Sequence, residues 1–117
     1  MKTVLIFALV IVTAILACRK SGIAKDIPDC IYKEIASNEA NHNWVIGSVE
    51  EYQFQNKIVY AFNPDEKIIA DAATSIRNSN CNQLCYIGGF GGPSVNLCNG
   101  ENFYQSAILK RIVWKKK

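Results

Sequence analysis

The chain has 117 residues, of which 13 are basic and 10 acidic, so the formal net charge is only +3. This length fits one domain. The basic cluster is confined to residues 110–117, which excludes the broad basic surface of a nucleic-acid-binding protein, and we expect no nucleic-acid partner.

The first segment of the chain has the pattern of a signal peptide. Met1 and Lys2 give a short positive start, and residues 3–17 carry no charge. At 1.5 Å per residue, such a run covers about 22 Å of a membrane core that is about 30 Å thick. The run is therefore too short for a permanent span, and it predicts a signal peptide over residues 1–17.

The end of this run, Ile15-Leu16-Ala17-Cys18, is similar to the bacterial lipobox. In that motif a peptidase cuts before a cysteine that carries a diacylglycerol thioether. By position, Cys18 would be the lipidated first residue of the mature chain, and two or three acyl chains hold a protein stably on a membrane. Ordinary secretion and an uncleaved anchor are the alternatives.

Residues 18–27 lack hydrophobic periodicity and contain glycine and serine, which predicts a flexible tether between the lipid and the domain. The single domain is then expected to comprise residues 28–117.

Four further cysteines follow Cys18. An even number in a small exported chain indicates disulfides, because the compartment is oxidising and a small core needs cross-links. Three pairings are open. We favour Cys30–Cys81, which would tie the N-terminal segment to the body, and Cys85–Cys98, which would close a glycine-rich loop. A zinc site with Cys30 or His42 as its fourth ligand is the alternative.

The first regular element of the domain is a helix. Ile27, Ile31 and Ile35 recur every four residues, which predicts one apolar helical face. Pro28 suits the helix start. We expect the helix to end within residues 38–43, where Asn and His replace the periodic apolar residues.

A β-hairpin follows the helix. Polar and apolar residues alternate over residues 51–55 and again over residues 58–62, with a turn at Asn56-Lys57 between them. This pattern is typical of half-buried strands. Because successive strand residues point to opposite faces, Glu50 and Glu51 do not form a paired acid–base dyad.

The rest of the chain predicts further strands. Residues 65–71 form a loop with a short strand at Ile68-Ile69, and residues 74–90 form a second hairpin whose turn contains three residues, Asn78 to Asn80, that suit tight turns. The C-terminal residues 107–114 alternate like a strand, with a helix over residues 103–111 as the alternative. The fold class is therefore α+β, with one N-terminal helix packed on an antiparallel sheet of about four to five strands.

The glycine-rich loop over residues 88–97 is the candidate contact surface. No Lys-Ser or Lys-Thr follows the glycines, which argues against a phosphate-binding loop and favours a tight turn with positive φ. Phe90 lies between the glycines, and it is the candidate partner contact together with Gly89 and Gly91. The alternative is that the Phe90 ring folds back onto the core.

The chain carries no enzyme signature. It lacks the Cys-x-x-Cys spacing of redox and haem proteins, and its single histidine, His42, lies in an Asn-rich segment expected at the surface. We expect no enzyme activity, no cofactor and no metal. The expected role is a binding or structural accessory module, and the alternative is a small inhibitor of a protease or cell-wall hydrolase that acts through residues 88–97.

Several segments together carry a family resemblance: the Cys30-Ile31 pair, the hairpin EYQFQNKIVYAF, the stretch NCNQLCYIGGFGG followed by Cys98, and the closing KRIVW. Over roughly residues 28–114 the chain resembles small lipoproteins of Bacteroidetes-type bacteria that are built on a domain of unknown function. The resemblance implies a fold and a cell-envelope location, and it implies no activity.

The residues after the lipobox indicate which side of the cell envelope the domain faces. Surface-exported lipoproteins of this kind commonly carry acidic residues after the lipidated cysteine, whereas Arg19 and Lys20 stand here. We therefore expect the domain to face the periplasm. Its expected partners are the membrane, through the N-terminal lipid, and an unknown protein or other envelope component.

Overall fold

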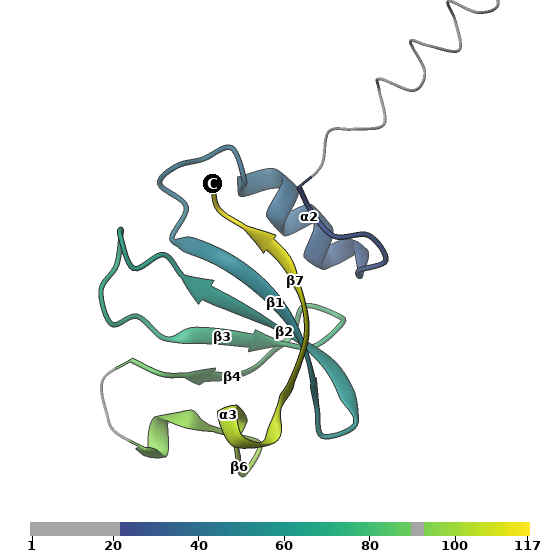
Figure 1. Ribbon diagram of the computed structural model, residues 1–117, viewed down its shortest axis with the longest axis vertical. Helices are drawn as coiled ribbons and strands as arrows, with labels where there is room; N and C mark the ends of the chain where they lie inside the picture. The colour runs from purple at the N-terminus through teal and green to yellow at the C-terminus, as the bar shows by residue number, and fades with distance from the viewer. Residues whose placement is uncertain (1–21, 90–92) are drawn as a thin grey trace, which may run out of the picture.

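The computed structural model describes residues 22–89 and 93–117 (Figure 1). The expected signal peptide, Cys18, Phe90 and Gly91 lie outside the described residues. The elements in chain order are α2 (Asp29–Asn38), β1 (Ile46–Phe54), β2 (Lys57–Pro64), β3 (Thr74–Arg77), β4 (Gln83–Ile87), a 3₁₀ turn (Pro93–Asn96), β5 (Leu97–Cys98), β6 (Glu101–Asn102), α3 (Phe103–Ser106) and β7 (Ile108–Lys115).

Helix α2 forms within the expected segment and has 10 residues. Ile31 and Ile35 are fully buried, so the four-residue spacing marks the face that packs on the sheet. Pro28 immediately precedes the helix, and Asp29 places a negative charge in its first turn, where the helix dipole favours it. The helix ends at Asn38, at the start of the predicted range.

The strands assemble into an antiparallel sheet. Over the described residues this main sheet has five strands in the order β4-β3-β2-β1-β7. Figure 1 shows that β7, the C-terminal strand, lies beside β1 and near helix α2. The expected sheet of four to five antiparallel strands, with a helix and disulfide cross-links, is confirmed.

The first hairpin turns one residue earlier than predicted. Its two turn residues are Gln55 and Asn56, with φ of 51° and 61°, and Phe54 pairs with Lys57. A two-residue loop with both φ values positive matches the right-handed twist of the flanking strands. This register keeps the Phe54 side chain buried, at 2% exposure.

Strand β2 is not half-buried, so the sequence prediction was wrong for this strand. Tyr60 and Phe62 pack in the cluster under helix α2, and Val59 and Ala61 pack in a second cluster with Phe103. The strand lies at the centre of a sheet whose two faces are both covered, and its run of apolar residues reflects this position.

The prediction of a short strand at Ile68-Ile69 is also wrong. These residues lie in a turn after β2, and both side chains are exposed.

The second hairpin is confirmed as β3 and β4. Its turn is held by the Asn78 side chain, whose Oδ1 accepts the backbone N–H groups of Asn80 (2.9 Å) and Asn82 (3.0 Å).

Both interpretations of the C-terminal segment hold in part. The short helix α3 comes first, capped by the Asn102 side chain, which accepts the Gln105 N–H at 3.2 Å. Strand β7 follows directly. Phe103 of α3 is fully buried, with its ring centre 5.0 Å from that of Tyr52 and 5.1 Å from that of Phe54.

Part of the segment expected to be a tether lies on the domain. Ile23 is buried in the core cluster under α2, and the Ala24 N–H donates to the Val113 carbonyl at 2.8 Å. Arg111 of β7 donates to the carbonyls of Lys25 (2.7 Å) and of the next residue (3.1 Å). Residues 23–26 are therefore held along β7.

Candidate functional site

The four cysteines of the domain form two disulfides within the described part of the chain, and these are the pairs that the sequence favoured. Cys30 of α2 is bonded to Cys81 in the β3–β4 turn, and Cys85 of β4 is bonded to Cys98 of β5. The Cα–Cα distances are 6.1 Å and 5.5 Å. The alternative zinc site is wrong, because these sulfurs are bonded to one another and not free as thiolates.

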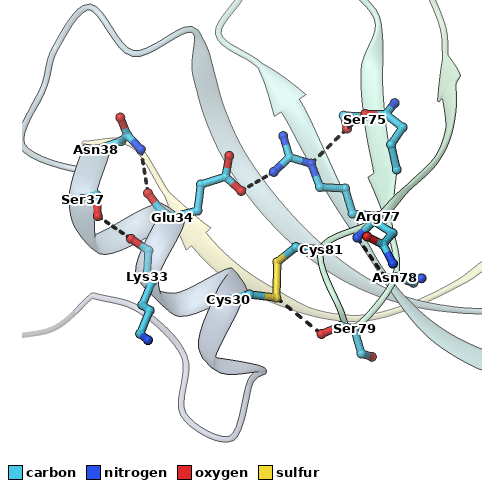
Figure 2. A network of polar contacts seen from close by, with 12 residues as sticks. Cys30, Lys33, Glu34, Ser37, Asn38, Ser75, Arg77, Asn78, Ser79 and Cys81 are labelled. Atoms are coloured by element: carbon cyan, nitrogen blue, oxygen red, sulfur yellow. Dashed lines mark hydrogen bonds and ion pairs between the residues drawn. A yellow bond between two sulfur atoms is a disulfide. The ribbon is translucent and has the colours of Figure 1, made fainter.

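Figure 2 shows an ion pair beside the first disulfide. Glu34 of α2 pairs with Arg77 at the end of β3, and the Arg77 Nε donates to the Ser75 hydroxyl at 3.1 Å. The guanidinium carbon also lies 4.0 Å from the centre of the Phe62 ring. The disulfide and the ion pair fasten the helix to the sheet, so their role is structural.

The glycines after β4 form a tight turn. Gly88 and Gly89 have φ of 81° and 78°, a backbone region that glycine adopts without a steric penalty. A Cβ on Gly89 would lie 3.2 Å from the Asp71 carbonyl oxygen. The Gly88 N–H donates to the Val95 carbonyl at 3.2 Å, across the loop that the second disulfide closes. Gly89, one of the expected partner contacts, is exposed.

A polar cleft of about 580 Å³ lies beside this turn. The 65–73 loop, the two glycines, α3 and the ends of β2 and β3 all contribute to it. Its lining residues are Asn63, Pro64, Glu66, Ala70, Asp71, Ala72, Thr74, Gly88, Gly89 and Tyr104.

Asn63 is the centre of a hydrogen-bond network at this cleft. Its side-chain amide donates to the Glu50 carboxylate and to the Ser48 hydroxyl, the latter at 3.1 Å. Its side-chain carbonyl accepts the Thr74 hydroxyl at 3.1 Å. The network joins β1, β2 and β3, and it fixes the orientation of the two polar side chains, Asn63 and Thr74, that reach the cleft.

Tyr52 extends this network on β1. Burial raises the pKa of Tyr52, and the nearby negative charge and hydrogen bond of Glu50 raise it further. The Tyr52 hydroxyl, which is protonated at neutral pH like that of any tyrosine, lies close enough to Glu50 to act as a donor to its carboxylate. A tyrosine hydroxyl and an asparagine amide thus both stabilise the half-buried charge of Glu50.

The cleft offers groups that hydrogen-bond a polar ligand. Amide, hydroxyl, carboxylate and phenol groups line it, and the lining residues that the structure describes include no histidine or cysteine. His42 lies exposed between α2 and β1. Tyr104 adds an aromatic ring that is 55% exposed, a surface on which a sugar ring or a flat group packs.

The sequence did not reveal this cleft. Asn63 and Thr74 are 11 residues apart and belong to different hairpins, and Tyr104 lies in a segment with two competing predictions. No spacing rule joins such residues. The turn glycines were the one signal, since Gly88 and Gly89 were singled out and both line the cleft.

Among residues 22–89 and 93–117, no helix combines the length and the apolar content needed to cross a membrane. No curated protein and no solved structure matches this chain. A family described as "Domain of unknown function (DUF6970)" matches residues 34–116. This range includes every strand of the main sheet and the whole of the polar cleft, and the chain therefore belongs to the DUF6970 family.

Proposed function

We propose that this protein is a lipid-anchored component of the bacterial cell envelope, cleaved before Cys18 and acylated there. Its α+β domain faces the periplasm and acts as a non-catalytic binding or accessory module. The observation that carries this proposal is the pairing of the other four cysteines with one another. Such cross-links suit an oxidising compartment. They use all four cysteines of residues 28–117, so a disulfide within the domain does not require Cys18.

The polar cleft is the binding surface in this proposal. The pre-oriented Asn63 and Thr74 side chains and the exposed Tyr104 ring suit a ligand rich in hydroxyl groups, such as a sugar of the envelope. Glu66 and Asp71, both exposed at the cleft, add acceptors for hydroxyl or amine donors.

The anchor is tested by expressing the full chain in bacteria fed a fatty acid with an alkyne label. The wild type is expected to carry the label and to sediment with membranes, whereas Cys18→Ser is expected to lose both properties. The double variant Cys30→Ser/Cys81→Ser is the matched control, since it removes other cysteines and is expected to keep the label. Label on Cys18→Ser, or an unlabelled wild type, would contradict the proposal.

Inhibition of a protease or cell-wall hydrolase is the second candidate function. The Cys85–Cys98 disulfide closes the base of the glycine-rich loop, as the rigid binding loop of an inhibitor requires. An inhibitor is expected to slow a lysozyme or serine protease, and to lose that effect in Phe90→Ala while keeping both disulfides. Equal inhibition by Phe90→Ala and the wild type would exclude this loop as the contact.

A further inference from the structure

Strand β7 is an edge strand that exposes aliphatic side chains. Within the described residues its partner in the main sheet is β1, and residues 23–26 lie along part of its other side. Leu109 and Ile112 are exposed by 50% and 56%, and they lie on one face of the strand, because they pair with Tyr52 and Glu50 of β1. Ile108 is 59% exposed but pairs with Gln53 and lies on the opposite face. Apolar side chains gathered on the edge of a sheet mark a surface that another body covers.

Basic residues lie along the same strand and directly after it. Arg111 and Lys116 are engaged by the domain, through the Glu51 carboxylate at 3.1 Å and the Asp65 carboxylate at 2.9 Å. The remaining lysines of the C-terminal segment are exposed. We call the following residues the β7 surface: Leu109, Lys110, Ile112, Lys115 and Lys117.

The chain outside the described residues ends close to this surface. The Ala24 N–H donates to the Val113 carbonyl at 2.8 Å, and Ile23 is 6% exposed. Three residues separate Cys18 from Gly22, which makes four steps from one Cα atom to the next. A fully extended chain covers at most about 3.6 Å per residue, so they reach no further than about 14 Å. An acyl chain on Cys18 would therefore hold the bilayer near the end of β7.

We propose that the β7 surface rests on the anionic surface of the membrane that anchors the protein. The Leu109 and Ile112 side chains enter the interface, and the exposed lysines pair with phosphate headgroups. Two observations select a bilayer as the occupant: the short distance between the lipid attachment point and β7, and the positive charge of the strand. This inference rests on the acylation of Cys18 proposed above.

Tryptophan quenching tests the inference on the acylated full chain reconstituted into vesicles. The vesicles contain phosphatidylglycerol and phosphatidylcholine with brominated acyl chains, which quench tryptophan on contact. Ile112→Trp is expected to show blue-shifted emission and a loss of intensity beyond that of the wild type, whose Trp44 and Trp114 supply the background. Tyr86→Trp is the matched control, because Tyr86 is 65% exposed on β4, the opposite edge strand.

A charge-matched pair of variants tests the lysines. In the Ile112→Trp background, Lys110→Gln/Lys115→Gln is expected to lose most of the quenching on phosphatidylglycerol vesicles, since each lysine near an anionic surface changes binding about fivefold. Lys33→Gln/Lys57→Gln removes the same charge from other exposed positions and is expected to leave the quenching unchanged. Equal losses in the two pairs would overturn the proposed role of the β7 lysines.

The outcomes separate the two proposals. If the starting material carries no acyl chain on Cys18, the proposed function fails. If the chain is acylated and neither Ile112→Trp nor Leu109→Trp is quenched more than Tyr86→Trp, the membrane contact alone is wrong. Thiol titration of each variant under denaturing, non-reducing conditions shows whether both disulfides have formed, and a variant with free thiols is replaced by the other β7 position.

Discussion

The negative charge of Glu51, which is partly buried, is stabilised by two neighbouring side chains. Its carboxylate accepts the Tyr60 hydroxyl at 3.2 Å and the Arg111 guanidinium at 3.1 Å. Burial raises the pKa of Tyr60 to about 12, and the negative charge of Glu51 contributes to the shift. Arg111 also donates to the backbone of the N-terminal segment, so one guanidinium group joins β1, β7 and residues 25–26.

Tyr60 is expected to titrate later than a free tyrosine. Its pKa lies near 12 in the folded protein and at 10.0 when free, so its protonated hydroxyl stabilises the fold fully below pH 10.0. This contribution is lost as the pH rises through about 12. Absorbance at the phenolate band is expected to lose the ionisation near pH 12 in Tyr60→Phe and to keep the ionisation of Tyr52, whose pKa is also raised. An unchanged ionisation near pH 12 in Tyr60→Phe would contradict this assignment.

Gly89 is expected to be intolerant of a side chain for two separate reasons. An L-residue pays about 1–2 kcal/mol for positive φ, and a Cβ would also lie 3.2 Å from the Asp71 carbonyl oxygen. Gly89→Ala is therefore expected to lower the free energy of unfolding by about 2 kcal/mol in urea denaturation. Gly100→Ala is the control, since Gly100 has φ of 82° and a Cβ there would meet no atom beyond its chain neighbours within 4 Å, and we expect a loss of about 1 kcal/mol. Equal losses would show that the contact with Asp71 has no effect.

At the scale of elements, each disulfide joins two segments that are not paired with each other in the main sheet. Cys30–Cys81 links α2 to the β3–β4 turn across 51 residues, and Cys85–Cys98 closes 13 residues. Loss of the longer loop is expected to cost about 4 kcal/mol and loss of the shorter one about 3 kcal/mol. Urea denaturation of Cys30→Ala/Cys81→Ala and of Cys85→Ala/Cys98→Ala measures both. A smaller loss for the 51-residue bridge would contradict the chain-entropy explanation.

The elements that could be predicted from sequence are those with local signals. The spacing of Ile31 and Ile35 identified the packed face of α2, and the alternation around residues 51–62 identified the first hairpin. Strand β2 was misjudged because burial of both its faces depends on α2 and α3, which lie far away in sequence. Likewise, Ile68 and Ile69 look like core residues in sequence, but no neighbouring strand pairs with them in the described structure.

The candidate site was less predictable than the fold. Its positive-φ glycines could be recognised, because Gly88 and Gly89 belong to a conspicuous local run. The network of Glu50, Asn63 and Thr74 could not, because it exists only once three strands are placed in register.

At the scale of the whole molecule, the topology brings residues 23–26 onto the C-terminal strand. Strand β7 pairs with β1 on one side and holds residues 23–26 on the other, so the N-terminal segment and the C-terminal strand meet (Figure 1). The polar cleft involves β2, β3 and α3. In our account this arrangement directs one surface of the domain to the membrane and leaves the cleft available to a ligand in the periplasm.

The most direct test of this account is the intact mass of the protein purified from bacterial membranes. We expect a chain that begins at Cys18, carries a diacylglycerol group, and is lighter by four hydrogens than its reduced form because of the two disulfides. A mass that corresponds to an unmodified chain starting at Met1, with four free thiols in the domain, would contradict both the anchor and the cross-linked fold.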